Sequence, residues 1–171
     1  MNETHINEEN MKSETPNIEP LNAEPCVTNS PYVEHLERYA MLLSQLKPER
    51  ISELGMLVSE TICFTDPFNR VQSKSAFLGI MADMFEQLDQ VSFEVFECQV
   101  QGEVGYLYWR FSATSPLAGA FKTEGVSRLV FDQQGRVVSH QDFWDASLLM
   151  EQFPLLGRVI RYIRRRAAYR A

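Results

Sequence analysis

A carboxylate stands at the end of an apolar stretch in residues 64–68, which read Phe-Thr-Asp-Pro-Phe. In the run before it, the period-two alternation of a strand places Ile62, Phe64 and Asp66 on one face. The two apolar side chains mark that face as the buried one. Pro67 lacks an N–H group, so the strand is expected to end there. The pattern predicts an inward-pointing aspartate at the point where the strand stops.

Two roles fit an aspartate in this position. Its side chain can accept hydrogen bonds from backbone N–H groups of the following turn, as aspartates in turns commonly do. It can also serve as a general base that takes a proton from a bound molecule or from water. The alternation places Glu60 on the same face, which weakens the assignment of that face to the interior. The residues alone leave both roles open.

A second group of polar side chains lies near the end of the chain, in residues 136–144. Val138, His140, Asp142 and Trp144 alternate along one face of a predicted strand. An imidazole, a carboxylate and an indole beside an aliphatic residue are typical of a pocket wall, which is mostly apolar with a few polar groups. The alternative is a face turned to solvent or to another subunit. In either case Asp142 lies close enough to His140 to fix its tautomer.

A third candidate is Tyr39, on the apolar side of a predicted helix. Its hydroxyl could donate a hydrogen bond into a cavity and stabilise an oxyanion. The alternative is a core tyrosine whose hydroxyl finds a backbone partner.

The surrounding sequence predicts helices first and strands afterwards. Apolar residues recur at three- and four-residue spacing in residues 30–46 and 73–88, and a short helix is predicted around residues 48–55. Strands are predicted over residues 91–101, 104–115, 119–132 and 136–144. The short breaks between them require antiparallel hairpins. This order predicts an α+β domain: a cone-shaped, curved antiparallel sheet covered by N-terminal helices, with a basic helix at the C-terminus.

Charge and apolar content divide the chain into three segments. Residues 1–29 are predicted to be a disordered acidic arm, because they contain glutamates and prolines but almost no large apolar side chains. Residues 30–146 form the predicted folded domain. Residues 147–171 are predicted to be an amphipathic, basic helical tail, in which residues 151–171 carry a net charge of +5.

Three interpretations of the tail stay open. It could lie on an anionic membrane surface as a peripheral contact. It could dock on the acidic body or on a partner. It could also pack its apolar side on the domain and leave its arginines in solvent.

The composition fits several classes of protein poorly. The net charge is −7, and an acidic body argues against nucleic-acid binding. Three widely spaced cysteines and only three histidines argue against a metal site. No apolar run approaches the about 20 residues of a transmembrane helix, and the acidic N-terminus is unlike a secretory signal. We therefore expect a cytoplasmic protein that uses no metal.

Several of these segments together resemble the nuclear transport factor 2 superfamily, and within it the SnoaL-like and ketosteroid-isomerase-like branches. The resemblance rests on ERYAMLL at residues 37–43, FTDPF at 64–68, FDQQGRVV at 131–138 and HQDFWD at 140–145. It covers roughly residues 30–146. It implies a cystatin-like cone with a cavity for a small, mostly apolar ligand, no cofactor, and a homodimer formed through the outer face of the sheet.

The resemblance also implies roles for individual residues. Asp66, followed by proline, matches the catalytic base of ketosteroid isomerases, and Tyr39, which follows an arginine, matches their oxyanion tyrosine. Ser127 stands where those enzymes have a second oxyanion donor, a protonated aspartate, so half of the oxyanion hole is missing. Trp144 corresponds to a pocket tryptophan. Asp142 takes a pocket position that is small and apolar in the isomerases, which is nearer to the cyclases and hydrolases of the superfamily.

Together the residues and the resemblance give two sets of candidates. The catalytic set is Asp66, Tyr39, His140 and Asp142. The ligand-binding set is Phe68, Trp144 and Ser127.

Two functions of different classes fit these candidates. The first is a SnoaL-like domain that binds a small, mostly apolar ligand in an accessory or regulatory role, without catalysis. The alternative is a cofactor-independent isomerase, cyclase or hydrolase with Asp66 as its general base. The incomplete oxyanion hole favours the first.

Overall fold

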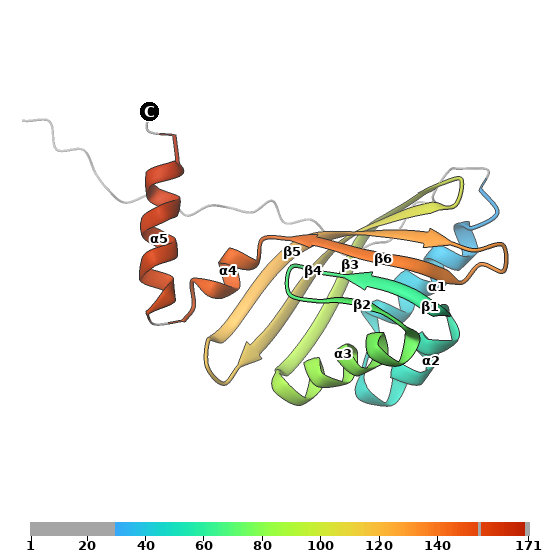
Figure 1. Cartoon of the computed structure of the whole chain (residues 1–171), viewed down its shortest axis with the longest axis horizontal. Coiled ribbons are helices and arrows are strands. Elements are labelled where there is room, and N and C mark those ends of the chain that lie inside the picture. The colour runs from blue at the N-terminus through green and yellow to red at the C-terminus, as the bar shows by residue number, and fades with distance from the viewer. Residues whose placement is uncertain (1–29, 154, 170–171) are drawn as a thin grey trace, which may run out of the picture.

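Figure 1 shows the computed structural model of the chain, which describes residues 30–153 and 155–169. The acidic arm predicted at residues 1–29 lies outside the described residues. The described chain is a mixed α+β structure with one curved, unclosed sheet and helices against it, as the sequence predicts.

Three helices precede most of the strands. They are α1 (Val33–Ser44), α2 (Ile51–Met56) and α3 (Lys74–Gln87), and a 3-10 turn at Pro48–Arg50 leads into α2. The hydroxyl of Ser73 accepts a hydrogen bond from the backbone N–H of Ala76 at 3.1 Å and so caps α3.

Six strands form the sheet, in the spatial order β2-β1-β6-β5-β4-β3. Their bounds are β1 Val58–Thr65, β2 Arg70–Gln72, β3 Asp89–Gln101, β4 Val104–Ser115, β5 Gly119–Phe131 and β6 Val137–Trp144. The last four form the predicted antiparallel meander. The short β2 was not predicted, because three residues are too few to show alternation.

One strand pairing in the sheet is parallel. β1 and β6 run in the same direction, and Phe64 pairs with His140. These strands are distant in the chain, so no hairpin fixes their relative direction. The expected sheet was antiparallel throughout; the parallel pair is what brings the end of β1 alongside the polar face of β6.

The helices lie against one face of the sheet, with α1 packed on β3 and α3 packed on β1 (Figure 1). The core between the layers contains Leu36, Tyr39, Phe77, Leu107, Trp109 and Leu129, all buried. Tyr39 and Trp109 carry polar groups into this core, and such groups need hydrogen-bond partners there.

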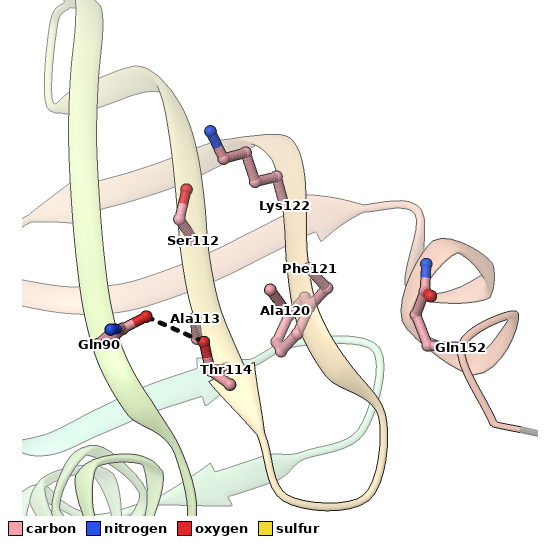
Figure 2. Close-up of a pocket in the computed structure, with 8 residues that line it drawn as sticks. All are labelled: Gln90, Ser112, Ala113, Thr114, Ala120, Phe121, Lys122 and Gln152. Carbon is pink, nitrogen blue, oxygen red and sulfur yellow. Dashed lines mark hydrogen bonds between the residues drawn. The ribbon is translucent and has the colours of Figure 1, made fainter.

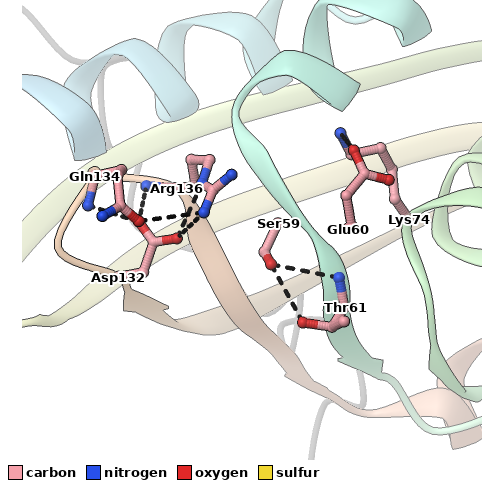
Figure 3. Close-up of polar contacts among 7 residues, drawn as sticks. All are labelled: Ser59, Glu60, Thr61, Lys74, Asp132, Gln134 and Arg136. Atoms are coloured by element: carbon pink, nitrogen blue, oxygen red, sulfur yellow. Dashed lines mark hydrogen bonds and ion pairs between the residues drawn. The ribbon is translucent and has the colours of Figure 1, made fainter.

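An irregular stretch of β1 changes the faces that simple alternation predicts. The pairing of β1 with β6 shifts register between Val58 and Cys63. As a result Glu60 is exposed and pairs with Lys74 at 2.5 Å, while Ser59 is buried and its hydroxyl lies 3.3 Å from that of Thr61 (Figure 3). The placement of Glu60 on the buried face was therefore wrong. From Val58 to Cys63 β1 advances five residues while β6 advances two, so the pairing is irregular there and a strict period of two does not describe it.

The turn between β5 and β6 sets the pairing of Phe131 with Val137, next to the turn. The carboxylate of Asp132 accepts hydrogen bonds from the backbone of Gln134 and Arg136 and from the guanidinium of Arg136 (Figure 3). Gly135 has a φ of +74°, a conformation that favours glycine. Beyond the turn the register shifts by one residue between Phe131 and Val130, and this shift places Ser127 directly opposite Asp142.

The C-terminal segment contains two helices, α4 (Ala146–Met150) and α5 (Leu156–Ala167). α5 stands apart from the sheet at one end of the molecule (Figure 1). Leu155, Val159 and Ile163 are each more than half exposed. The interpretation in which the apolar side of the tail packs on the domain was therefore wrong for these residues. Among the described helices, none is long and apolar enough to cross a membrane.

Two glycines allow a test of how tightly the inner face is packed. A Cβ on Gly125, in the middle of β5, would lie 2.6 Å from the indole of Trp109 and 2.8 Å from the backbone oxygen of Phe143. We expect Gly125→Ala to lower the free energy of unfolding by about 1–3 kcal/mol, because the indole must move. Gly79→Ala in α3, where no atom lies within 4 Å of the added Cβ, should raise it by about 0.5–1 kcal/mol through helix propensity. Urea unfolding measures both; equal stabilities would contradict the packing described.

Candidate functional site

The centre of the site is His140, on the inner face of β6. Its side chain is only 4 % exposed. Three aromatic rings surround the imidazole, with centroid distances of 5.2 Å to Phe64, 5.7 Å to Tyr39 and 5.9 Å to Phe77. Each ring comes from a different element, β1, α1 or α3. The imidazole therefore depends on the whole fold for its position, and it has no access to bulk water for hydrogen bonding.

Both nitrogens of His140 have protein partners. Nδ1 lies 2.9 Å from the hydroxyl oxygen of Tyr39, and Nε2 lies 2.9 Å from Oδ1 of Asp142. When the carboxylate of Asp142 is ionised it only accepts, so Nε2 carries the hydrogen and Nδ1 accepts the hydroxyl hydrogen of Tyr39. Asp142 thus fixes the tautomer of the imidazole, and Tyr39 donates to it.

Ser127 and Trp109 complete this network. The hydroxyl of Ser127 donates to Oδ1 of Asp142 at 2.5 Å and lies 3.2 Å from Nε2 of His140. The indole N–H of Trp109 donates to Oγ of Ser127 at 2.8 Å. The close approach of the indole to Gly125 makes this bond possible. The result is a continuous chain of hydrogen bonds that satisfies every buried polar side chain in it.

Burial controls the ionisation of Tyr39. Loss of solvation, and to a smaller extent the charge of Asp142, raise the pKa of Tyr39 well above its ordinary value of 10.0. The phenol is therefore neutral at physiological pH and remains a hydrogen-bond donor. Its hydrogen is directed to His140 rather than into an open space. The role of oxyanion donor to a ligand stays a prediction.

At its outer end the network reaches the surface through Asp142, whose side chain is 17 % exposed. Two residues further along the same face of β6 lies Trp144, and the ring of Phe68 meets its indole edge-on at a centroid distance of 5.5 Å. Asp66 and Phe68 belong to the turn after β1, and the register of the parallel pair places this turn beside the end of β6. We call Asp66, Phe68, Asp142 and Trp144 the acidic aromatic patch.

Asp66 has a local structural role. Its Oδ1 accepts hydrogen bonds from the backbone N–H groups of Phe68, at 2.7 Å, and Asn69, at 2.6 Å. The amide of the Asn69 side chain donates to both carboxylate oxygens. These are the turn contacts that the sequence predicts as the first of two roles. The role of general base stays a prediction.

The structure thus divides the predicted candidates into two groups. Tyr39, Ser127, His140 and Asp142 form one hydrogen-bonded network. The remaining candidates, Asp66, Phe68 and Trp144, lie with Asp142 in the acidic aromatic patch. Ser127 is buried, so its direct contact with a ligand also stays a prediction.

Sequence reasoning did not identify the part that Trp109 plays. Gly125 could have indicated that a bulky side chain packs close by, because a glycine within a strand often marks the close approach of another group. The partner of that glycine could be recognised only from the β4–β5 register, which pairs Trp109 with Gly125.

A separate pocket of about 440 Å³ lies at the far ends of β4 and β5 (Figure 2). Its lining includes Ala113, Phe121, Lys122 and Gln152, but none of the predicted site residues. In residues 30–153 and 155–169, no three His, Cys, Asp or Glu side chains are grouped so that they could hold a metal ion.

Comparison with known proteins places this geometry in a family. The family model for the SnoaL-like domain matches residues 37–140, more than half of the chain. No curated protein shows a significant match.

Solved structures share the fold at low sequence identity. A hypothetical protein from Catenulispora acidiphila with a ketosteroid isomerase-like fold, in complex with trimethylamine, is 16 % identical with a TM-score of 0.61, over 71 % of this chain and 94 % of that chain. An NTF2-like protein from Burkholderia thailandensis is 17 % identical with a TM-score of 0.63, over 73 % and 98 %. An LEH-like epoxide hydrolase from M. tuberculosis is 11 % identical with a TM-score of 0.58, over 77 % and 95 %. The predicted fold and resemblance are thereby confirmed.

The hydrogen bond of Tyr39 predicts a dependence of stability on pH. Tyr39→Phe leaves Nδ1 of His140 buried without its donor, and we expect it to lower the free energy of unfolding by about 1–3 kcal/mol at neutral pH. The raised pKa means that the native state keeps the phenol proton above pH 10, where the unfolded chain releases it. The wild type should therefore lose stability as the pH rises above 10, and Tyr39→Phe should lose less.

Urea unfolding across this pH range measures the difference. Tyr106→Phe, at an exposed tyrosine of β4, is the matched control. A Tyr39→Phe curve parallel to the wild type in the alkaline range would contradict the assignment.

Proposed function

This chain belongs to the SnoaL-like domain family, and we propose that its domain binds a small, mostly apolar ligand at the acidic aromatic patch. The observation that carries the proposal is the position of Asp142. His140 and Ser127 hold its carboxylate from the buried side, yet its side chain is still partly exposed. Both bonds end on Oδ1, and Oδ2 accepts no hydrogen bond from any described residue. A fixed carboxylate oxygen of this kind is suited to bind a donor group of a ligand.

The contacts of the patch favour a particular ligand polarity. Asp142 and Asp66 present only acceptors when ionised. The hydroxyls of Tyr39 and Ser127, which could donate to a carbonyl oxygen, already donate within the network. The carboxylates of the patch therefore suit an amine or a hydroxyl of the ligand and disfavour a carboxylate, while the indole N–H of Trp144 is a donor that a carbonyl oxygen could use.

The aromatic residues of the patch suit the apolar part of such a ligand. The rings of Phe68 and Trp144 meet edge-on and offer a partly exposed apolar surface beside the carboxylates. Aromatic faces also attract alkylammonium groups. The Catenulispora acidiphila protein of the same fold was solved with trimethylamine, which supports small alkylamines as first probes.

Replacement of Asp142 tests the proposal without disturbing the network. Because both of its hydrogen bonds end on Oδ1, an asparagine keeps this acceptor and changes only the charge and the outward atom. We expect trimethylammonium to bind the wild type and Asp142→Asn to weaken binding by about tenfold or more, the loss of one favourable charge contact. Titration calorimetry measures the affinity.

Two controls define the outcome. Asp83→Asn removes one charge from an exposed site in α3 and should leave the affinity unchanged. An acetate probe of similar size should not bind. Equal affinities for Asp142→Asn and the wild type, or binding of acetate in preference to the amine, would overturn the proposal.

A second candidate function is acid–base catalysis at the same carboxylate. The observation that favours it is the relay from Tyr39 through His140 to Asp142, which connects a buried donor to a partly exposed proton acceptor. In this role Asp142 takes a proton from water or substrate, and His140 supports the charge change. The fold is shared with an epoxide hydrolase, and opening of a small epoxide by activated water needs no cofactor.

Paired variants distinguish the possible bases. If Asp142 is the base, Asp142→Asn should reduce epoxide hydrolysis by about 100-fold or more, whereas Asp66→Asn should retain most of it. Asparagine at position 66 keeps the Oδ1 acceptor for the turn, so the fold should survive the change. Steady-state rates with a panel of small epoxides measure both variants. Loss of activity only in Asp66→Asn would instead assign the base to Asp66.

A further inference from the structure

α5 exposes a continuous apolar side. Successive residues of a helix are separated by about 100°, which places Leu155, Leu156, Val159 and Ile163 on one side of it. Their exposed fractions range from 45 % to 80 %. Exposed aliphatic side chains that are contiguous along a helix indicate an interaction surface.

The opposite side of α5 faces α4 and the turn after it, and the contacts there include several polar ones. The guanidinium of Arg161 donates to the backbone oxygen of Glu151 at 2.9 Å. Arg164 pairs with the carboxylates of Glu151 at 3.0 Å and Asp145 at 3.5 Å. Gly157 is buried on this side, so close to Glu151 that an added Cβ would clash with its backbone oxygen.

This arrangement is the reverse of ordinary helix packing. An amphipathic helix on a globular domain normally turns its apolar side to the core and its charges to solvent. Here the charged side holds α5 to α4 and the residues beside it, and the apolar side points away from them. Rotating α5 to bury its apolar side would break the contacts of Arg161 and Arg164 and separate Gly157 from Glu151.

Cationic side chains border the apolar side. Arg158 and Arg165 lie along one of its edges, and neither forms a hydrogen bond or ion pair with another residue in the described part of the chain. Near the C-terminal end, the guanidinium of Arg166 lies 5.9 Å from the centre of the Tyr162 ring. Residues 151–171 carry a charge of +5 on a chain whose total is −7, so the tail is the one strongly cationic segment of the sequence.

We propose that α5 lies in the interfacial region of an anionic lipid bilayer and attaches the domain to it. The aliphatic side enters the boundary between headgroups and acyl chains, and the bordering arginines reach lipid phosphates. With 12 residues the helix is about 18 Å long, shorter than the about 30 Å hydrocarbon core, so it lies along the surface instead of crossing it. The contacts of Arg161 and Arg164 orient α5 so that α4 lies on the side away from the bilayer.

Charge favours a bilayer over a second copy of this chain as the occupant. Residues 31–150 are acidic overall and could attract the arginines, but a partner must also take up the aliphatic side chains. An anionic bilayer provides both, because its negatively charged headgroups lie directly above an apolar interior. A second copy is the competing outcome of the test.

Co-sedimentation of the full-length protein with vesicles tests this proposal. The vesicles contain phosphatidylcholine alone or phosphatidylcholine with phosphatidylserine. We expect binding to the anionic vesicles that falls with added salt, and little binding to the neutral ones. The double variant Val159→Asp, Ile163→Asp should lose about tenfold or more in apparent affinity, because it places charges in the apolar side. Arg158→Gln with Arg165→Gln should weaken binding to anionic vesicles only.

Matched variants and size-exclusion chromatography complete the design. Leu117→Asp makes the same kind of change at a highly exposed apolar residue of the β4–β5 turn and should bind like the wild type. Because Val159 and Ile163 are exposed, the double variant should keep the thermal stability of the domain. The proposal is overturned if anionic vesicles do not bind the protein, or if the double variant binds as well as the wild type. A dimer that the double variant converts to a monomer, without vesicle binding, would assign the surface to a second copy.

Discussion

The hydrogen bonds of His140 connect elements that are far apart in the chain. A buried imidazole needs a partner for each nitrogen, since an unsatisfied polar group in a core costs about 1–3 kcal/mol. α1 supplies Tyr39 for one nitrogen, and the neighbouring position on β6 supplies Asp142 for the other. The carboxylate of Asp142 in turn needs hydrogen-bond donors, and the hydroxyl of Ser127 on β5 supplies one.

Several features of the fold follow from this network. The turn at Gly135, together with the one-residue register shift between Phe131 and Val130, places Ser127 opposite Asp142. Gly125 leaves room for the indole of Trp109, whose N–H then reaches Ser127. The parallel pairing of β1 with β6 puts the Phe64 ring against the imidazole and the turn of Asp66 beside the outer carboxylate. The same contacts that stabilise the core therefore hold one carboxylate of the acidic aromatic patch in a fixed orientation.

The two ends of the hydrogen-bonded network differ in their access to a ligand. Tyr39 is fully buried, and its raised pKa keeps it a neutral donor to His140. Asp142 lies at the boundary between the core and solvent, where a rigid acceptor can meet a ligand. The C-terminal helix shows a similar division, with Arg161 and Arg164 turned to the residues around α4 and the aliphatic side chains turned outward. In both places the polar contacts inside the protein determine which groups remain for a partner.

The sequence by itself determined the architecture and the identity of most site residues. Apolar periodicity and short turns predicted the helices and the four-stranded meander, and alternation placed His140 and Asp142 on one face. Sequence patterns could not determine the irregular pairing around Glu60 or the parallel direction of β1, because neither leaves a periodic signal. Only the tertiary structure decided that the hydroxyls of Tyr39 and Ser127 donate within the network, and that α5 presents its apolar side to solvent. The physical reason is that hydrogen bonds and ion pairs form between residues distant in the chain, and their partners are defined only when the strands and helices have packed together.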